Sequence, residues 1–397
     1  PPRSTLFPYT TLFRSSRTST KPSFLDRLGE AMLRPWPGVP LALVVVLISL
    51  GIVVFGGDLI REGLLMALVE QVIVPFFERL ITPMNLPTVL HNILIGEYGV
   101  FRISFEWILA LVIPYVILFQ AVFALLEDSG ILPRISVLFD NIMRKLGVQG
   151  GSLIHIFLGF GCAVPAIIST RTATTHKERL MVTAMICFAI PCISQTGALL
   201  SLLSAYSAWL VVATALTGAL VFFTVSLVLR KAFKGSVDPL VLEVPNLLLP
   251  EPRAYFKKLG IRIRHFLVDA EGPMLIAVFI AAILAETGLL AGLGNLMKPV
   301  VSGWLGLPEE AVMSLILGII RREMSVAPLV GMNLNPLQMY VGAVVSLLYL
   351  PCLSVFAILT REFNVRTAVT IAAGTTLTAL FVGGVMNHLI LFIQSIF

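Results

Sequence analysis

The sequence predicts a multi-pass, all-α membrane protein, and three observations carry this prediction. Hydrophobic residues make up 57% of the 397 residues and charged residues only 13%, against roughly 25% charged residues in soluble domains. Several uncharged apolar runs are long enough to cross a hydrocarbon core, which takes about 20 helical residues. Cationic residues lie mostly between these runs, where they orient helices in a bilayer. So large an excess of apolar side chains has to face lipid, which excludes a soluble globular domain.

The apolar runs give the expected membrane segments. They span residues 35–57, 107–126, 146–170, 180–229, 272–285, 324–360 and 367–397. The run 180–229 is long enough for two crossings and has a polar break near Ser204–Ser207. The four cysteines are too few and too deeply placed to predict a disulfide framework.

Charge between the apolar runs predicts their orientation. Positive residues favour the cytoplasmic side of a membrane, and eight lysines and arginines gather in residues 230–270. We therefore expect a basic cytoplasmic loop there. Segment 58–106 has three arginines against six acidic residues, and we expect it to be periplasmic and amphipathic. The net charge of +6 thus follows from membrane orientation and does not indicate a nucleic-acid partner.

The run 146–170 is predicted to enter and leave the membrane on the same side, because basic clusters precede and follow it. Gly159, Gly161 and Pro165 lie at its centre, where a helix is expected to break. We call this broken, re-entrant segment gate 1.

The second half of the chain repeats features of the first at offsets of 158 to 160 residues. Leu146-Gly147 recurs as Leu305-Gly306, Leu158-Gly159 as Leu317-Gly318, Asp128-Ser129-Gly130 as Glu286-Thr287-Gly288, and Ile190-Pro191-Cys192-Ile193-Ser194 as Leu350-Pro351-Cys352-Leu353-Ser354. Each copy holds three expected crossings, and an odd number turns the second copy upside down. Inverted repeats with broken helices organise many secondary transporters, whose sites lie at the repeat interface.

The predicted fold is therefore two inverted-topology repeats, each with three transmembrane helices and a re-entrant broken-helix gate, plus one extra N-terminal transmembrane helix. Residues 1–16 repeat a Thr-Leu-Phe unit without helical periodicity and are interpreted as a non-native or artefactual leader. The remaining parts are a cytosolic lead-in with the first transmembrane helix (17–57), the periplasmic segment (58–106), repeat 1 with gate 1 (107–229), the basic loop (230–270) and repeat 2 with gate 2 (271–397).

Cysteines stand at the expected helix breaks and are the candidate metal ligands. Cys162 lies in gate 1, and Cys192 and Cys352 follow Pro191 and Pro351. Broken helices persist in lipid only where protein or a water-filled cavity surrounds them, so we expect the three thiols to meet in the core. Thiolates suit softer transition metals. A lone buried cysteine is more often just a small hydrophobic residue, but the recurrence of Pro-Cys in both halves favours a pathway.

Other candidates are polar or helix-breaking residues at membrane depth. The expected gate or pathway residues are Gly159, Gly161, Pro165, Pro191, Gln195, Thr196, Glu323, Met324 and Pro351. Arg321-Arg322-Glu323 interrupts the second half at the place of Gly161–Cys162, where a charge costs roughly 2.5–3.5 kcal/mol. The alternative is a locally neutralised Arg–Glu pair at a helix end. Glu127 and Asp128 either attract a cation at a cytoplasmic mouth or cap the next helix.

Several of these motifs, in this order, resemble the membrane permease part of the FeoB ferrous-iron transporters, which contains gate (nucleoside-recognition) segments. They are Leu125–Gly130, Gly159–Ile167, Arg171-Thr172, Glu178–Leu180, Glu243–Pro245, Arg321–Glu323 and Tyr349–Cys352. The resemblance implies a ferrous-iron permease with Cys162, Cys192 and Cys352 along the route. Ala163 stands where the family usually has Asn, and the stretch around Cys192 departs from the family pattern. Both departures bear on the substrate more than on the fold.

The resemblance leaves the family's amino-terminal G domain without a counterpart. Three explanations are open: a separate polypeptide, a sequence truncated upstream, or a branch that works without GTP. The sequence contains no phosphate-binding Gly-x-x-x-x-Gly-Lys-Ser/Thr loop, so any GTP hydrolysis is expected in another chain. We expect no catalytic or cofactor-binding residue, and we expect a transporter and not an enzyme.

The predicted function is transport of Fe²⁺, as substrate, across the bacterial cytoplasmic (inner) membrane. The alternatives are a gate-fold carrier for another divalent metal or a nucleoside-like solute, and a non-transporting membrane subunit. The expected partners are the lipid bilayer, a separate G protein, a small accessory protein and a second copy of the chain.

Overall fold

The computed structural model describes residues 24–81, 113–204, 206–233, 247, 251–268, 294 and 297–396. Every regular element in these ranges is a helix, as the composition predicts. Five stretches are long and apolar enough to cross a membrane: Pro35–Phe76, His176–Ser204, Ala208–Ala232, Pro336–Glu362 and Val365–Ser395. Ile113–Asp128 and Ile131–Leu146 form a pair bent by 78° that can count as a sixth. The chain is thus a multi-pass helical membrane protein. The expected crossing at 272–285 lies outside the described residues.

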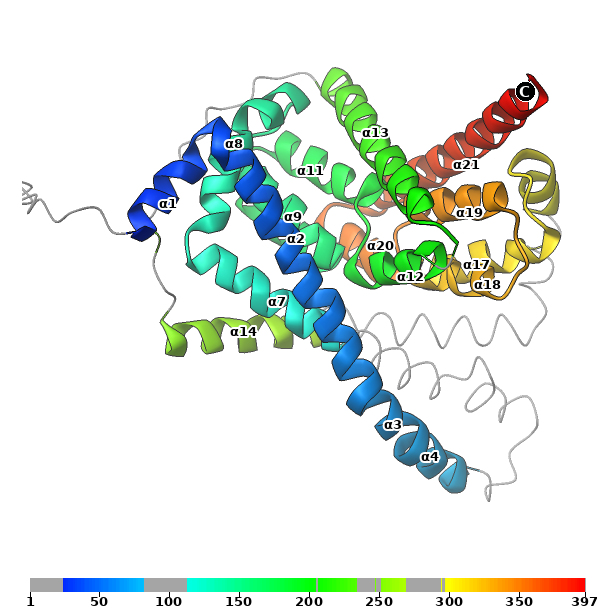
Figure 1. Ribbon diagram of the computed structural model, residues 1–397, viewed down its shortest axis with the longest axis horizontal. Coiled ribbons are helices and arrows are strands. Elements are labelled where there is room, and N and C mark those ends of the chain that lie inside the picture. The colour runs from blue at the N-terminus through cyan, green and yellow to red at the C-terminus, as the bar shows by residue number, and fades with distance from the viewer. Residues whose placement is uncertain are drawn as a thin grey trace, which may run out of the picture.

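The N-terminal part is one long rod that crosses the rest of the molecule diagonally (Figure 1). It follows the short helix α1 (Phe24–Leu33) and consists of α2 (Pro35–Ile60), η2 (Arg61–Leu65), α3 (Met66–Leu68), η3 (Val69–Ile73) and α4 (Val74–Ile81). The rod continues past residue 57, where the apolar run ends. No proline lies between residues 57 and 74, so nothing there removes a helical amide.

The next part of the chain contains the first broken helix. It consists of α7 (Ile113–Asp128), α8 (Ile131–Leu146), η6 (Gly150–Ser152), and α9 (Leu153–Gly161) and α10 (Ala163–Ser169), which are the two parts of the broken helix. Gly147 ends α8 with a φ of 92°, in the left-handed region that glycine adopts without strain. Only Cys162 separates α9 from α10, and its backbone is extended (φ −153°, ψ 132°). The helix is therefore interrupted at the thiol.

Three longer helices complete the first half. They follow η7 (Thr170–Thr172) and are α11 (His176–Ala189), α12 (Ile193–Ser204) and α13 (Ala208–Ala232). The Thr175 side chain caps α11 by accepting from the amide of Glu178. The chain leaves helical geometry at Pro191, and again between α12 and α13, near the polar break predicted from the sequence.

The second half shows the same order of elements. After α14 (Pro252–Phe266) come η9 (Pro299–Trp304), η10 (Glu309–Ala311), α17 (Val312–Ile320), η11 (Arg322–Ser325), α18 (Ala327–Val330), α19 (Pro336–Leu348), α20 (Leu353–Glu362) and α21 (Val365–Ile396). Arg321, 159 residues after Cys162, is likewise an extended residue that interrupts a helix (φ −143°, ψ 138°). Gly306, 159 residues after Gly147, likewise has a positive φ of 68°.

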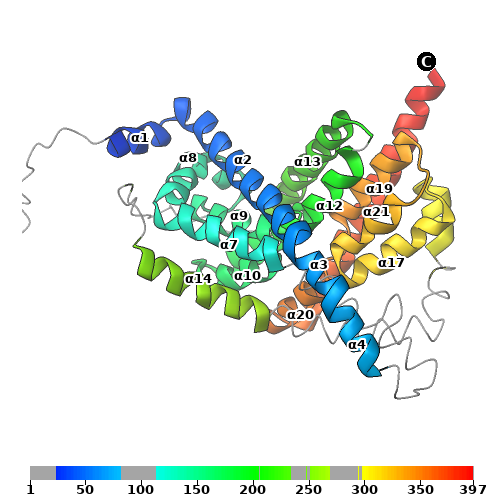
Figure 2. The same ribbon diagram turned by 60° about the horizontal axis from the view of Figure 1, so that its bottom comes forward.

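The two halves are joined by an exchange of helices (Figures 1 and 2). Helix α12 of the first half packs against α19 and η11 of the second, and α20 of the second packs against α10 of the first. The two large apolar clusters accordingly mix both halves: Val355 and Ile358 of α20 lie in the first cluster, and Leu199 and Leu202 of α12 lie in the second. The exchange brings the two Pro-Cys segments, which precede α12 and α20, to the centre of the molecule.

Candidate ion pathway

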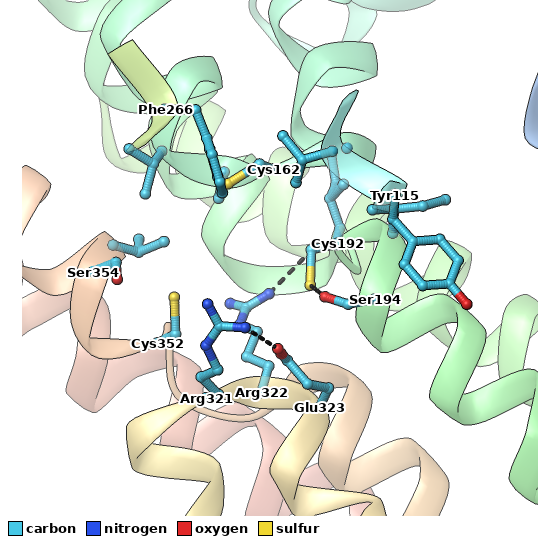
Figure 3. A pocket seen from close by; sticks show the side chains of 17 residues that line it. Tyr115, Cys162, Cys192, Ser194, Phe266, Arg321, Arg322, Glu323, Cys352 and Ser354 are labelled. Carbon is cyan, nitrogen blue, oxygen red and sulfur yellow. Dashed lines mark hydrogen bonds and ion pairs between the residues drawn. The ribbon is translucent and has the colours of Figure 1, made fainter. Parts of the chain in front are cut away.

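A cavity of about 70 Å³ lies where the helix breaks meet (Figure 3). Cys162, Cys192, Cys352 and Glu323 all line it, each from a different interruption of a helix or from the turn next to one. The Sγ of Cys192 lies 3.4 Å from the Oγ of Ser194. None of the three cysteines forms a disulfide bond. The structure thus gathers the three candidate cysteines and one carboxylate around a common space.

The cysteines share this space without forming a closed metal site. Among the described residues, no group of three or more His, Cys, Asp or Glu side chains lies close enough to hold an ion together. Gly161 also lines the cavity, and a Cβ there would overlap the ring of Phe119. The three thiols and the Glu323 carboxylate therefore line the cavity as separate groups.

Arg322 connects the two Pro-Cys segments through their backbones. Its guanidinium donates to the carbonyl oxygen of Cys187, to that of Ile190 at 3.2 Å and to that of Leu350 at 3.3 Å. Pro191 has no amide hydrogen, so it leaves the Cys187 carbonyl without its helical partner. An unpaired buried carbonyl is costly. Arg322 is itself only 5% exposed, so the guanidinium and the freed carbonyls satisfy one another.

Arg321 and Glu323 form a locally neutral pair in the cavity wall. Nη1 of Arg321 lies 2.9 Å from Oε1 of Glu323, and the two side chains are 9% and 7% exposed. The pair matches the alternative considered for this charged segment, an Arg–Glu pair at a helix end. Glu323 nevertheless still faces open space, because it lines the cavity described next as well.

A second, larger cavity of about 690 Å³ adjoins the first. Tyr115, Ser194 and Glu323 line both cavities, so these three side chains form their common boundary. The wall of the larger cavity also carries Asp58 and Glu62 from the long N-terminal rod. Among the described residues that line it, Arg61 is the single basic one, against three acidic ones. An excess of acidic groups around a partly enclosed space raises the local concentration of cations.

Tyr115 lies at the point where the two cavities meet. Its hydroxyl donates to the Oδ1 of Asp58, which ties helix α7 to the rod. The Tyr115 side chain stands beside Cys192 and Ser194 in Figure 3.

The other residues expected in the pathway line neither of these cavities. They are Gly159, Pro165, Pro191, Gln195, Thr196, Met324 and Pro351. Gln195 is fully buried and donates from Nε2 to the Ser346 carbonyl at 2.6 Å. Thr196 donates to the Cys192 carbonyl at 2.9 Å. Both polar side chains after the first Pro-Cys thus donate to backbone carbonyls in this structure, and their place in a pathway stays a prediction.

Glu127 and Asp128 form ion pairs with helix α14. Lys258 lies 3.1 Å from Glu127 and 2.6 Å from Asp128, and Arg262 lies 2.6 Å from Glu127. The next helix, α8, has Gly130 at its N-cap without a side-chain cap. The two carboxylates thus fix α14 against α7, and neither of them caps α8. Their role in attracting a cation at a cytoplasmic mouth stays a prediction.

Further contacts continue along the same pair of helices. The Tyr255 hydroxyl donates to the Ala121 carbonyl at 2.9 Å. Burial and the nearby Asp128 raise the pKa of that hydroxyl, which keeps it protonated as a donor. Phe266, at the end of α14, is buried and lines the small cavity near Cys162. Helix α14 therefore runs from the paired carboxylates to the thiols.

Sequence reasoning did not single out several of these residues. Arg322 was considered as a charge, and its contacts to three carbonyls depend on a fold that joins distant segments. Tyr115 and Phe266 carry no local signal, because an aromatic residue in an apolar run is usually core. Ser194 had one available signal, since it closes the repeated Pro-Cys-x-Ser motif.

The helical bundle, with its paired helix breaks and central cavities, defines a multi-pass helical membrane protein. The family model described as "Nucleoside recognition" (Gate) matches residues 109–206 and again 268–366. The model described as "Ferrous iron transport protein B C terminus" matches residues 211–262. Together the matches cover more than half of the chain. The chain belongs to the FeoB family and corresponds to its membrane domain.

Curated relatives agree with this assignment. A protein of Synechocystis named Fe(2+) transporter FeoB is 29% identical over 74% of this chain and 51% of its own length. Proteins of the same name from Methanocaldococcus jannaschii and Staphylococcus aureus are 28% and 25% identical, over 60% and 63% of this chain. The chain spans 41% and 42% of those two relatives, so it corresponds to about half of such proteins or less. No solved structure matches it.

The contacts of Arg322 give a test of the fold at the site. Arg322→Lys keeps the charge, but a single ammonium cannot reach all three carbonyls in the geometry of the planar guanidinium. We expect the free energy of unfolding to fall by about 2–3 kcal/mol. The measurement is the thermal unfolding temperature of the detergent-solubilised protein, which should be clearly lower than that of the wild type. Arg366→Lys, at an exposed position of α21, is the matched control and should unfold at the wild-type temperature. Equal unfolding temperatures for both variants would show that the Arg322 contacts are dispensable.

Proposed function

We propose that this chain moves Fe²⁺ across the bacterial cytoplasmic membrane through the two adjoining cavities. The observation that carries the proposal is the gathering of Cys162, Cys192 and Cys352 with Glu323 around one space at the centre of the bundle. Relatives of about 25–29% identity are named Fe(2+) transporters, which supports the same substrate here.

In the proposed route the ion enters through the larger cavity. Asp58 and Glu62 attract a cation from water, whereas Arg321 balances the charge of Glu323. The ion then passes Tyr115 and Ser194 into the smaller cavity and exchanges water for sulfur and oxygen ligands. Weak binding to one or two groups at a time allows it to leave again.

The lining chemistry favours a transition-metal cation over the other substrates considered. Acidic groups outnumber basic ones in the larger cavity, which favours a cation over a neutral nucleoside-like solute. Thiols suit softer metals and are poor ligands for Mg²⁺ or Ca²⁺. The guanidinium groups of Arg321 and Arg322 would balance the negative charge of thiolate ligands in the smaller cavity.

We propose that the two halves are inverted repeats. Recurrent features at an offset of 159 residues support this: the extended residues Cys162 and Arg321, and the positive-φ glycines Gly147 and Gly306. The two matches to one family model support it as well. Inverted repeats would place the site at their interface near the midplane, and the exchange of α12 and α20 between the halves supports this, because the cysteines that precede these helices line one cavity.

Partners complete the proposal. A G protein and a small accessory protein would act from the cytoplasmic side, where the basic loop 230–270 is expected. Movement of α14 is a direct way for them to reach the site, because Phe266 lines the thiol cavity. A second copy of the chain is the remaining proposed partner.

The cysteines provide the first test. In proteoliposomes under anaerobic conditions, Cys162→Ser, Cys192→Ser and Cys352→Ser combined should lower Fe²⁺ uptake by about tenfold or more, since losing groups at a metal site costs at least this much. Cys187→Ser, at a fully buried cysteine outside the cavity, is the control and should retain uptake. Wild-type uptake by the triple variant would reject the thiols as ligands.

The larger cavity provides a second test. Glu62→Gln removes one acidic group from its wall and should raise the apparent KM for Fe²⁺ by about two- to threefold at low ionic strength, and less at high salt. Glu70→Gln changes an exposed acid on the same rod that does not line the cavity, so its KM should not change. A KM shift of equal size in both variants would show a general surface-charge effect and no defined entry.

The inversion is tested by labelling from the two sides of the membrane. Arg144 and Gly303 are both exposed and stand 159 residues apart. Cysteines introduced at these positions, after the native cysteines are replaced by serine, should react with a membrane-impermeant maleimide from opposite sides of oriented vesicles. Reaction of both from the same side would contradict inverted repeats.

A further inference from the structure

The cations of helix α14 fall into two groups with different surroundings. Lys258 and Arg262 face α7 and pair with Glu127 and Asp128. The second group consists of Arg253, Lys257 and Arg264, which are exposed and have no ion-pair partner among the residues that the structure describes. α14 is thus held to the bundle by one face, while its other face carries uncompensated charge.

The three outer cations lie on one stripe of the helix. Positions 253, 257 and 264 follow the spacing i, i+4 and i+11, which returns to the same side of an α-helix. Large apolar side chains flank this stripe on both sides: Phe256 is 67% exposed and Leu267 42% on one flank, and Ile261 is 50% exposed and Val268 65% on the other. An outer face of cations bordered by exposed apolar groups is unusual for a surface that meets only water.

We propose that this outer face of α14 binds the anionic headgroup surface of the bilayer. Helices at a membrane interface combine lysines and arginines with apolar side chains that enter the headgroup–acyl boundary. Anionic lipid attracts each nearby cation, while long basic side chains extend toward the phosphates and their stems lie along apolar surface. The occupant is the lipid surface itself.

The position of α14 supports lipid as the occupant. Its inner face packs on α7, half of the bent pair that can count as a membrane span, and both views show it at the edge of the molecule beside that helix (Figures 1 and 2). A helix fixed to the flank of a membrane bundle meets the bilayer before it meets any soluble partner. The four flanking apolar side chains can be buried in the acyl region of a bilayer, whereas in water they stay exposed to solvent.

Lipid binding at this face reaches the thiol cavity through α14 itself. The same helix ends in Phe266, which lines that cavity, and its inner cations hold Glu127 and Asp128. Anionic lipid on the outer face therefore holds α14 in the position seen here, with Phe266 against the cysteines. The proposed lipid binding does not depend on whether the transported substrate is Fe²⁺.

Hydrogen exchange of the full chain in lipid nanodiscs tests the proposal. We compare discs of phosphatidylcholine with discs of equal parts phosphatidylcholine and phosphatidylglycerol. Amides of residues 252–266 should exchange about tenfold more slowly in the anionic discs, because the three cations add to membrane binding. In the variant Arg253→Gln, Lys257→Gln, Arg264→Gln, this dependence on lipid charge should disappear.

The matched control removes three exposed cations from three other helices: Arg79→Gln, Lys231→Gln and Arg366→Gln. It has the same net charge as the α14 variant and should keep the wild-type dependence on lipid. Wild-type exchange in α14 that is equal in both discs overturns the proposal. Loss of the dependence in the control as well overturns it too, because the effect then follows net charge.

Discussion

The guanidinium of Arg322 is the interaction on which the centre of this molecule depends. Two proline-broken helices from opposite halves present carbonyl oxygens where lipid-embedded backbone has to find partners, and Arg322 donates to carbonyls on both. A buried arginine and buried free carbonyls are each costly alone. Together they satisfy one another and fix the separation of Cys192 and Cys352. Irregular backbone can thus persist in the core, and the cavity lined by the three cysteines lies beside it.

The exchange of helices explains why one arginine can reach both breaks. Because α12 packs on the second half and α20 on the first, the segments just before them cross at the centre. Glu323, next in sequence to Arg322, then stands at the boundary of the two cavities together with Tyr115 and Ser194. Arg322, which holds the two helix breaks, and Glu323, which lines both cavities, are therefore neighbours on the short helix η11. A shift of this helix moves both side chains.

The sequence predicted the class of fold correctly, since composition and run length alone determine that helices face lipid. It also located the interruptions at Cys162 and Pro191, because glycine and proline act locally. The contacts of Glu127 and Asp128 were not predictable in this way: their partners on α14 lie about 130 residues away, and charge pairing at such separation depends on packing. Polarity alone suggests Gln195 and Thr196 as pathway residues. Gln195 donates to the Ser346 carbonyl, a contact across 151 residues that depends on packing, whereas Thr196 donates to the nearby Cys192 carbonyl. Tyr115 and Asp58 meet only because the rod crosses α7.

Reactivity of single cysteines tests the account's central claim most directly. Variants that keep only Cys192, only Cys352 or only Cys187 are reconstituted and exposed to a small water-soluble methanethiosulfonate, with and without Fe²⁺ under anaerobic conditions. We expect Cys192 and Cys352 to react with the methanethiosulfonate and Fe²⁺ to slow both reactions, while Cys187 stays unreactive. Unreactive cavity cysteines, or rates that Fe²⁺ leaves unchanged, would contradict a thiol-lined route held open between the two broken helices.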